Sequence, residues 1–309
     1  MKRRLIKQGG GGFTIYLPKK WADSKGLKEG DDVHIKERDT ALIIQSARQE
    51  RSEKTIELNE HNRKDMYPLL THTYRGGADK LTFNNVTPAD VKSIKQYAER
   101  LLLGFEVTDV KDNTLILENI SEPTEERYEA LFRRIFLIIK ETHTLLEESA
   151  RTGTYDSLSE VEILRDQQDK FILFCKRTLM KERKEINPSI EWELLTWLMH
   201  INHSYHYLYK YAAKNNVGKS RKLDSFLPEL RTYFEHLYNA YYKKDVKEVH
   251  TLNAKREQLH FGKCYDAIAS SKGKEAVLLC HVRELFRIIQ LGSSPVLTLL
   301  LQEEVGEKK

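Results

Sequence analysis

Three carboxylates on one expected helix have the spacing of a metal site. Glu162, Asp166 and Asp169 are four and three residues apart within the segment 158–180, whose apolar period predicts a helix. At 100° per residue these side chains fall within an arc of about 60°, so they form one stripe. Carboxylate oxygens are hard ligands that suit Mg²⁺, Mn²⁺ or iron. The alternative is a solvated helix face neutralised by cations such as Arg165, and the scarcity of acidic residues on the neighbouring helices favours this alternative.

Three histidines on the next expected helix raise the question of a zinc site. His200, His203 and His206 follow one another at intervals of three residues within the segment 190–213. On a helix they spread over about 120° on the side opposite the apolar stripe, so the three cannot converge on one ion. His203 and His206 alone would supply two ligands, whereas zinc takes three or four. The sequence therefore does not favour zinc at these histidines.

Basic residues gather at the start of the chain. The whole chain carries a formal net charge of only +5, but residues 1–50 hold 11 Lys and Arg against 7 Asp and Glu. Such cations contact DNA phosphates, which position a protein without reading the base sequence. The predicted contacts are Lys2, Arg3, Arg4 and Lys7, with Lys19 and Lys20 as weaker candidates. The alternative is that these cations only solubilise an exposed edge strand.

The sequence shows no catalytic set, so we expect no enzyme. It has no nucleophile elbow, no HExxH motif and no phosphate-cradling loop, and the spacing around Gly76-Gly77 fits a turn. The cysteines Cys175, Cys264 and Cys280 are far apart in apolar-periodic stretches, and we expect them to be reduced packing residues. No uninterrupted apolar run reaches the roughly 18 to 20 residues that cross a bilayer. A cytoplasmic protein without membrane insertion is therefore expected.

The elements that would position the first basic residues fit within about 45 residues. Strands are expected at residues 5–8, 13–17, 33–36 and 41–45. The glycines 9–12 allow a tight reversal between the first two strands. Pro18 suits the first turn of a short helix, and Gly26 suits the left-handed end of that helix. Glu37-Arg38-Asp39-Thr40 is expected to connect the last two strands.

This order of elements resembles the AbrB/MazE/SpoVT swapped-hairpin DNA-binding domain over residues 1–47. The resemblance rests on the glycine turn, on Leu17-Pro18-Lys19-Lys20 and on Gly26-Leu27-Lys28-Glu29-Gly30-Asp31. It implies a homodimer whose two chains interleave their hairpins and present paired basic loops to double-stranded DNA. A module of fewer than about fifty residues also rarely supports a core of its own. Because the loop consists of glycine alone, phosphate contact is the firmer expectation and base readout the weaker one.

Residues 53–120 are predicted to form a small α/β module, and the following residues helices. In the module, strands are expected at 55–58, 79–85, 105–110 and 114–117, with helices at 63–74 and from Thr87. Thr87, Pro88 and Asp90 are typical of a capped helix start. Beyond Ser121-Glu122-Pro123-Thr124 the period is helical. Helices are expected from about residue 128 to 146 and at 158–180, 190–213, 226–242, 246–269 and 274–291.

The two successive three-helix units, 121–214 and 224–292, resemble the halves of a PhoU domain. The expected fold class is therefore a multidomain α+β protein with an N-terminal swapped-hairpin β domain, a small α/β middle module and a C-terminal all-α PhoU-like pair of three-helix bundles. The whole chain resembles archaeal PhoU-type phosphate uptake regulators that carry such an N-terminal domain. The resemblance implies acidic metal-binding motifs on the helices, of which Glu162, Asp166 and Asp169 retain one. A divalent metal or iron is accordingly the candidate cofactor.

These features predict a dimeric DNA-binding transcriptional regulator whose helical half is a sensor or docking module. The part played by phosphate uptake is implied by the resemblance. The alternative is a PhoU-like interaction protein that docks a phosphate transporter or a sensor kinase, in which the N-terminal module serves only for dimerisation. An antitoxin is disfavoured, because such proteins usually follow the hairpin with a short disordered tail, whereas helical periodicity continues here.

Overall fold

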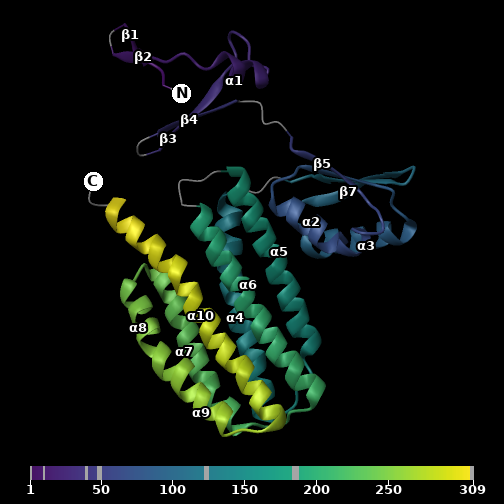
Figure 1. Cartoon of the computed structure of the whole chain (residues 1–309), viewed down its shortest axis with the longest axis vertical. Coiled ribbons are helices and arrows are strands. Elements are labelled where there is room, and N and C mark those ends of the chain that lie inside the picture. The colour runs from purple at the N-terminus through teal and green to yellow at the C-terminus, as the bar shows by residue number, and fades with distance from the viewer. Residues whose placement is uncertain are drawn as a thin grey trace. The chain divides into compact units, whose positions relative to one another are not determined.

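The computed structural model describes residues 2–9, 11–38, 41–46, 51–121, 125–182 and 188–306. Two compact units, Met1–Arg51 and Ser52–Lys309, make up the chain (Figure 1). The fold is mixed α+β, with a small β region at the N-terminus and a helical region at the C-terminus. The predicted turn at Asp39-Thr40 and most of the predicted linker, Glu122–Thr124, lie outside the described residues.

The first unit consists of two hairpins and one short helix. Its elements are β1 (Ile6–Gln8), β2 (Gly12–Thr14), α1 (Lys19–Ser24), β3 (Val33–Arg38) and β4 (Ala41–Ser46). Both β1–β2 and β3–β4 pair antiparallel. Gly9 and Gly11 have positive φ in the first reversal, which glycine adopts without strain. The prediction of a strand through Leu17 was too long, because β2 ends at Thr14 and the chain then leads into α1.

The second unit begins with a four-stranded sheet of order β5-β6-β8-β7. The strands are β5 (Glu53–Glu57), β6 (Lys80–Asn84), β7 (Phe105–Lys111) and β8 (Thr114–Asn119). Strand β5 is parallel to β6, and the other pairs are antiparallel. The helices α2 (Met66–Arg75), preceded by the 3₁₀ turn η1 (Arg63–Asp65), and α3 (Pro88–Leu101) lie on one face of the sheet (Figure 1). Leu81, Phe83, Leu115 and Leu117 are buried on alternate positions of the two central strands.

Two local predictions in this module are confirmed. The hydroxyl of Thr87 accepts from the Asp90 N–H, and the Asp90 carboxylate accepts from the Thr87 N–H, which is a complete capping box with Pro88 next in the helix. Asp112 and Asn113 both have positive φ between β7 and β8. That conformation belongs to the tight hairpin turns that Asp and Asn tolerate. Short-range sequence signals therefore determine this helix start and this hairpin turn.

Seven α-helices of the second unit follow the sheet. They are α4 (Glu125–Thr152), α5 (Leu158–Glu182), α6 (Pro188–Asn215), α7 (Arg221–Lys243), α8 (Val246–Arg256), α9 (Cys264–Ala269) and α10 (Gly273–Gly306). They share one hydrophobic core, in which Phe132 and Phe136 of α4 stack on Tyr241 of α7 and Tyr128 packs against Phe132. Helix α10 packs along α6 and α7 (Figure 1). Core burial thus joins the residues of both predicted three-helix units.

Several of these helices depart from the predicted boundaries, since α4 and α7 are longer than predicted and the last two predicted helices differ more. The segment predicted as one helix over 246–269 is interrupted by a π-helical stretch, η2 (Glu257–Lys263). Helix α10 does not end near Leu291 but continues through Pro295 to Gly306. Pro295 lacks an N–H and normally breaks a helix, yet Val296, Leu299 and Leu300 beyond it are buried. Their packing outweighs the local preference.

Helix α10 also bears on two expectations about apolar residues. Its segment Gly273–Gln302 is long and apolar enough to cross a membrane by length and composition, contrary to the expectation that no segment would qualify. More than half of the window, 56%, is buried inside the protein, as in the core helix of a globular fold. Cys175 and Cys264 are buried as expected, but Cys280 on α10 is exposed, so the packing prediction is wrong for that thiol.

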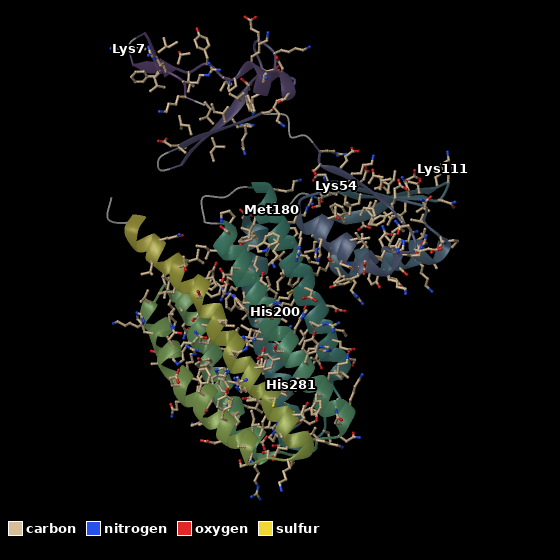
Figure 2. All side chains as sticks on the ribbon, viewed as in Figure 1. Lys7, Lys54, Lys111, Met180, His200 and His281 are labelled. Carbon is tan, nitrogen blue, oxygen red and sulfur yellow. The ribbon has the colours of Figure 1, made fainter. Side chains whose placement is uncertain are left out.

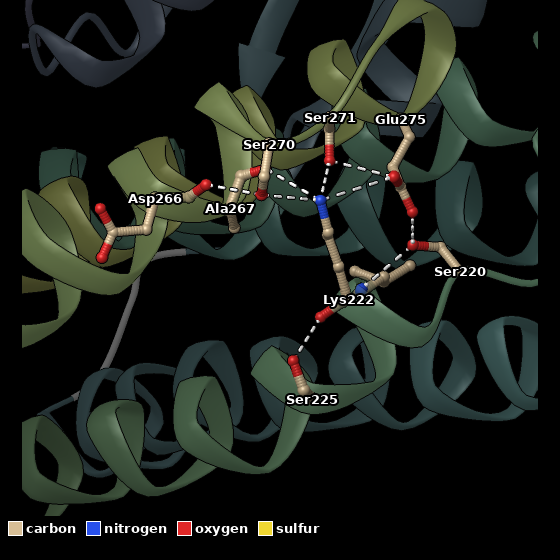
Figure 3. A network of polar contacts seen from close by, with 9 residues as sticks. Ser220, Lys222, Ser225, Asp266, Ala267, Ser270, Ser271 and Glu275 are labelled. Carbon is tan, nitrogen blue, oxygen red and sulfur yellow. Dashed lines mark hydrogen bonds and ion pairs between the residues drawn. The ribbon is translucent and has the colours of Figure 1, made fainter.

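A polar network fastens the start of α7 to the turn between α9 and α10 (Figure 3). The hydroxyl of Ser220, which caps α7, lies 2.8 Å from a carboxylate oxygen of Glu275. The Lys222 ammonium donates to the hydroxyls of Ser270 at 2.9 Å and Ser271 at 2.6 Å. Ser271 in turn donates to Glu275 at 3.0 Å. These contacts fix the connecting turn against the bundle.

Candidate functional site

The six predicted DNA contacts all lie on the surface of the first unit. Lys2, Arg3 and Arg4 precede β1, Lys7 lies within it (Figure 2), and Lys19 and Lys20 begin α1. All six residues are exposed. None of them forms an ion pair with any residue that the structure describes. Their charge is therefore available to a ligand in solution.

The geometry of the β1–β2 hairpin limits what these cations can recognise. In its register Lys7 is opposite Phe13, and Gln8 is opposite Gly12. The reversal itself consists of glycines, which offer backbone donors but no side chain to a base edge. Cations on a hairpin of this kind suit phosphate contacts, whereas base readout needs side chains that enter a groove.

Apolar side chains of the same unit are uncovered. Phe13 is 68% exposed, Tyr16 68% and Leu42 66%, with Leu5, Ile6, Ile15 and Ile35 also exposed. No residue in the ranges 2–9, 11–38 and 41–46 whose side chain the structure describes is fully buried. One copy of the unit thus removes little apolar surface from water, although such burial supplies most of the stabilisation of a fold.

The three carboxylates of α5 each have a separate partner. A Glu162 oxygen lies 3.5 Å from Nε2 of His206, and Asp169 accepts from Nε2 of His203 at 2.9 Å. Asp166 pairs with the neighbouring Arg165 at 2.8 Å, and it also pairs with Arg100 of α3 at 3.5 Å. His203 and His206 of α6 therefore contact two different acids. The predicted stripe is real as a line of acids, but each acid is paired by itself.

This pairing bears on the predicted metal site. Within the described part of the chain, no group of three or more His, Cys, Asp and Glu residues has the arrangement of a metal site. The Arg165 and Arg100 guanidinium groups occupy the oxygens of Asp166, where a divalent cation would meet repulsion. The donor set as arranged thus does not fit a resident metal ion. Metal binding at Glu162, Asp166 and Asp169 remains a prediction.

Burial favours the uncharged form of two histidines of α6. Burial lowers the pKa of His206, and the nearby Arg165 lowers it further, although the Glu162 carboxylate opposes the shift. Burial also lowers the pKa of His200, and His203 and Lys176 act in the same direction. A neutral imidazole beside a carboxylate acts as a hydrogen-bond donor without forming an ion pair.

A buried charged joint between the sheet module and the bundle was not predicted. Arg177 of α5 is 1% exposed, and its guanidinium donates to the carbonyls of Tyr74 at 3.1 Å and Ala78 at 2.5 Å. It also donates to the Asp79 carboxylate at 2.8 Å, and Lys181 pairs with the same carboxylate. Burial alone raises the pKa of Asp79, but the hydrogen bond from Lys181 and its other partners bring it below the ordinary value. Asp79 is thus ionised and doubly paired.

The one sequence signal for this joint is the pair Lys176-Arg177 within an apolar run. Lys176 is 2% exposed, and its ammonium donates to the Thr196 hydroxyl at 2.7 Å and lies 4.9 Å from the centre of the Trp192 ring. Two adjacent cations between Phe174 and Leu179 are unusual on a core face, because buried charges need partners. Their presence indicates that another element covers this stretch of α5.

Comparison with known proteins found no match. It matches no family model, and neither the curated proteins nor the solved structures include a significant match. The support for a function therefore comes from the side chains of this protein.

Proposed function

We propose that the protein is a dimeric DNA-binding transcriptional regulator. The observation that carries the proposal is the surface of the first unit, where six exposed cations without ion-pair partners among the described residues accompany uncovered apolar side chains. The cations supply the phosphate contacts, and the apolar side chains supply a reason for two chains to associate. Both properties are concentrated in about fifty residues.

The dimer follows from the apolar surface. Phe13, Ile35 and Leu42 are more than half exposed in one copy of the unit. A second copy that interleaves its hairpins would cover them, and a symmetric pair would also place two sets of cations along one duplex. Sequence-independent phosphate contact is the main source of affinity in this arrangement.

The helical half is proposed as the sensor or docking module. The similarity of its order of elements to PhoU domains supports phosphate uptake as the regulated process. The second candidate function is an interaction protein that docks a transporter or kinase, and the observation that favours it is the same apolar surface, because dimerisation does not require DNA. The two functions differ in whether the six cations meet a duplex.

Fluorescence anisotropy with labelled double-stranded DNA tests the proposal. The wild-type protein should bind at low salt and lose affinity as the salt concentration rises, because phosphate contact releases counterions. Changing Lys2, Arg3 and Arg4 together to alanine should weaken binding to all sequences alike. It should also reduce the slope of log affinity against log salt by about three, roughly one for each contact.

A matched control removes the same charge elsewhere. Lys54, Lys92 and Lys95 are exposed on the sheet module (Lys54 in Figure 2), and their triple alanine variant should bind DNA with the wild-type slope. Light scattering on Phe13→Asp should show loss of the dimer. A wild-type protein that is dimeric yet does not bind DNA at low salt would refute the regulator and leave the docking protein.

A further inference from the structure

The π-helical segment η2 is the most unusual backbone feature of the bundle. It spans Glu257–Lys263 between α8 and α9 and contacts α10. The Cys264 N–H bonds to the carbonyl of Leu259, five residues back, as a π-turn requires. Such turns are rare and occur frequently at functional sites. The side chains that η2 places against α10 are therefore candidates for a functional role.

Two buried polar atoms at this contact lack a hydrogen-bond partner among the described residues. His260 is 5% exposed, and its Nε2 atom is buried without a hydrogen bond to any described residue. The Nε of Arg283 on α10 is buried in the same state. A buried polar group without a hydrogen bond destabilises a fold and calls for an explanation. A ligand that accepts hydrogen bonds from both would supply one.

The surroundings of His260 carry an excess of positive charge. Burial lowers the pKa of His260, and the guanidinium groups of Arg283, Arg256 and Arg287 lower it further, while the Glu284 carboxylate opposes the shift. Only Arg287 of these three pairs with a carboxylate among the described residues, at 2.6 and 2.8 Å from Glu284. Arg256 and Arg283 form no ion pair with a carboxylate among the residues that the structure describes, although Glu284 interacts with Arg283 electrostatically.

The guanidinium groups of Arg256 and Arg283 lie over aromatic rings. Arg256 lies 5.1 Å from the centre of the Phe261 ring, and Arg283 lies 4.7 Å from that of Tyr265 while it donates to the Tyr265 hydroxyl at 3.0 Å. The two rings are themselves in edge contact. Stacking of this kind orients a guanidinium and leaves its outer N–H groups free to donate.

We propose that Arg256, His260, Arg283 and Arg287, the η2 cation cluster, bind a phosphate-type oxyanion. Its several acceptor oxygens match the forked donors of guanidinium groups, and its charge offsets the excess of cations. Arg256 is exposed, so the cluster is open to solvent, while His260 forms its buried side. The anion is supplied either by free inorganic phosphate or by a small phosphate monoester. The site goes beyond the proposed DNA binding, which resides in the first unit and does not require it.

Isothermal titration calorimetry on the full chain tests this site. Sodium phosphate and glycerol 3-phosphate are the two probes, and sodium chloride at matched ionic strength is the blank. Arg256→Gln and His260→Gln should each weaken binding of the effective probe by about tenfold or more, the scale of one charge-assisted hydrogen bond. Arg151→Gln, which removes an exposed charge from α4 of the same bundle, should leave binding unchanged.

The outcomes separate the source of the anion and the validity of the site. Heat from phosphate alone, or from the monoester alone, identifies the source, and either supports the cluster. No heat above the chloride blank from either probe up to about 10 mM, the scale of a very weak complex, overturns it. Wild-type binding by Arg256→Gln overturns it as well, and because that side chain is exposed, the variant is not expected to unfold. DNA binding measured on the same samples shows whether the two functions fail separately.

Discussion

Replacing Lys176 by methionine should stabilise the protein. Burial lowers the pKa of this ammonium, the charge of Arg75 adds to the shift and Asp169 opposes it, so that the pKa falls from 10.5 to about 8. Each pKa unit corresponds to about 1.4 kcal/mol, so carrying this charge destabilises the fold by about 3 kcal/mol at pH 7. Methionine fills a similar volume without the charge. The Thr196 hydroxyl keeps its bond to the Trp192 carbonyl at 2.8 Å.

The pH dependence follows from the lowered pKa. Between about pH 8 and 10.5 the unfolded chain holds the Lys176 proton and the folded chain releases it. Wild-type stability from this group therefore rises with pH across that window, and below pH 8 the full penalty applies. Burial raises the pKa of Tyr205, which makes the fold less stable above pH 10, but this effect is common to both proteins. The free-energy difference between variant and wild type isolates the lysine.

Urea unfolding followed by helical circular dichroism measures this difference. Lys176→Met should be more stable by up to about 3 kcal/mol at pH 7, and the advantage should decline towards pH 10. Lys214→Met, at an exposed position of α6, is the matched control and should change stability little at either pH. A variant less stable than wild type at pH 7, or a difference that is constant with pH, would refute the buried-charge argument.

Three further changes test contacts that hold the second unit together. Asp79→Ala removes the carboxylate that pairs with the buried Arg177, so urea unfolding should show a loss of about 3–5 kcal/mol; since the pKa of Asp79 is lowered, wild-type stability from this pair should be lost only as pH falls below the ordinary aspartate range. Thr87→Ala removes the capping hydroxyl of α3 and should destabilise by about 1 kcal/mol in the same assay, whereas Thr87→Ser should retain most of it. Lys222→Met breaks the network in Figure 3 and should speed hydrogen exchange in the α9–α10 turn, while unchanged exchange there would show that the network does not fix the turn.

Local signals in the sequence predicted much of the fold. The apolar period located the helices, and Thr87 with Asp90 marked the start of α3 because a capping box is formed by residues three apart. The ends of long helices were less predictable. The predicted end near Leu291 was wrong, because burial of Val296 and Leu299 is decided by residues far away in the chain. Tertiary packing overrides propensity there.

The candidate sites divide in the same way. The stripe of Glu162, Asp166 and Asp169 followed from helical geometry, but their partners Arg100, His203 and His206 lie on other helices and could not be assigned from spacing. The Arg177–Asp79 pair joins residues 98 positions apart, and a π-turn alters the helical period by a single residue. Neither leaves a periodic trace in a sequence.

The buried contact between Arg177 and Asp79 connects α5 to the sheet module. Asp166 and Arg177 lie eleven residues apart on one continuous helix, a separation of about 16 Å at 1.5 Å per residue. The acidic end of α5 is paired with α3 through Asp166 and Arg100. At the loop before β6 the Arg177 guanidinium bonds to Tyr74, Ala78 and Asp79. A single side chain of α5 thus carries three hydrogen bonds to the sheet module, so loss of Arg177 would break them together.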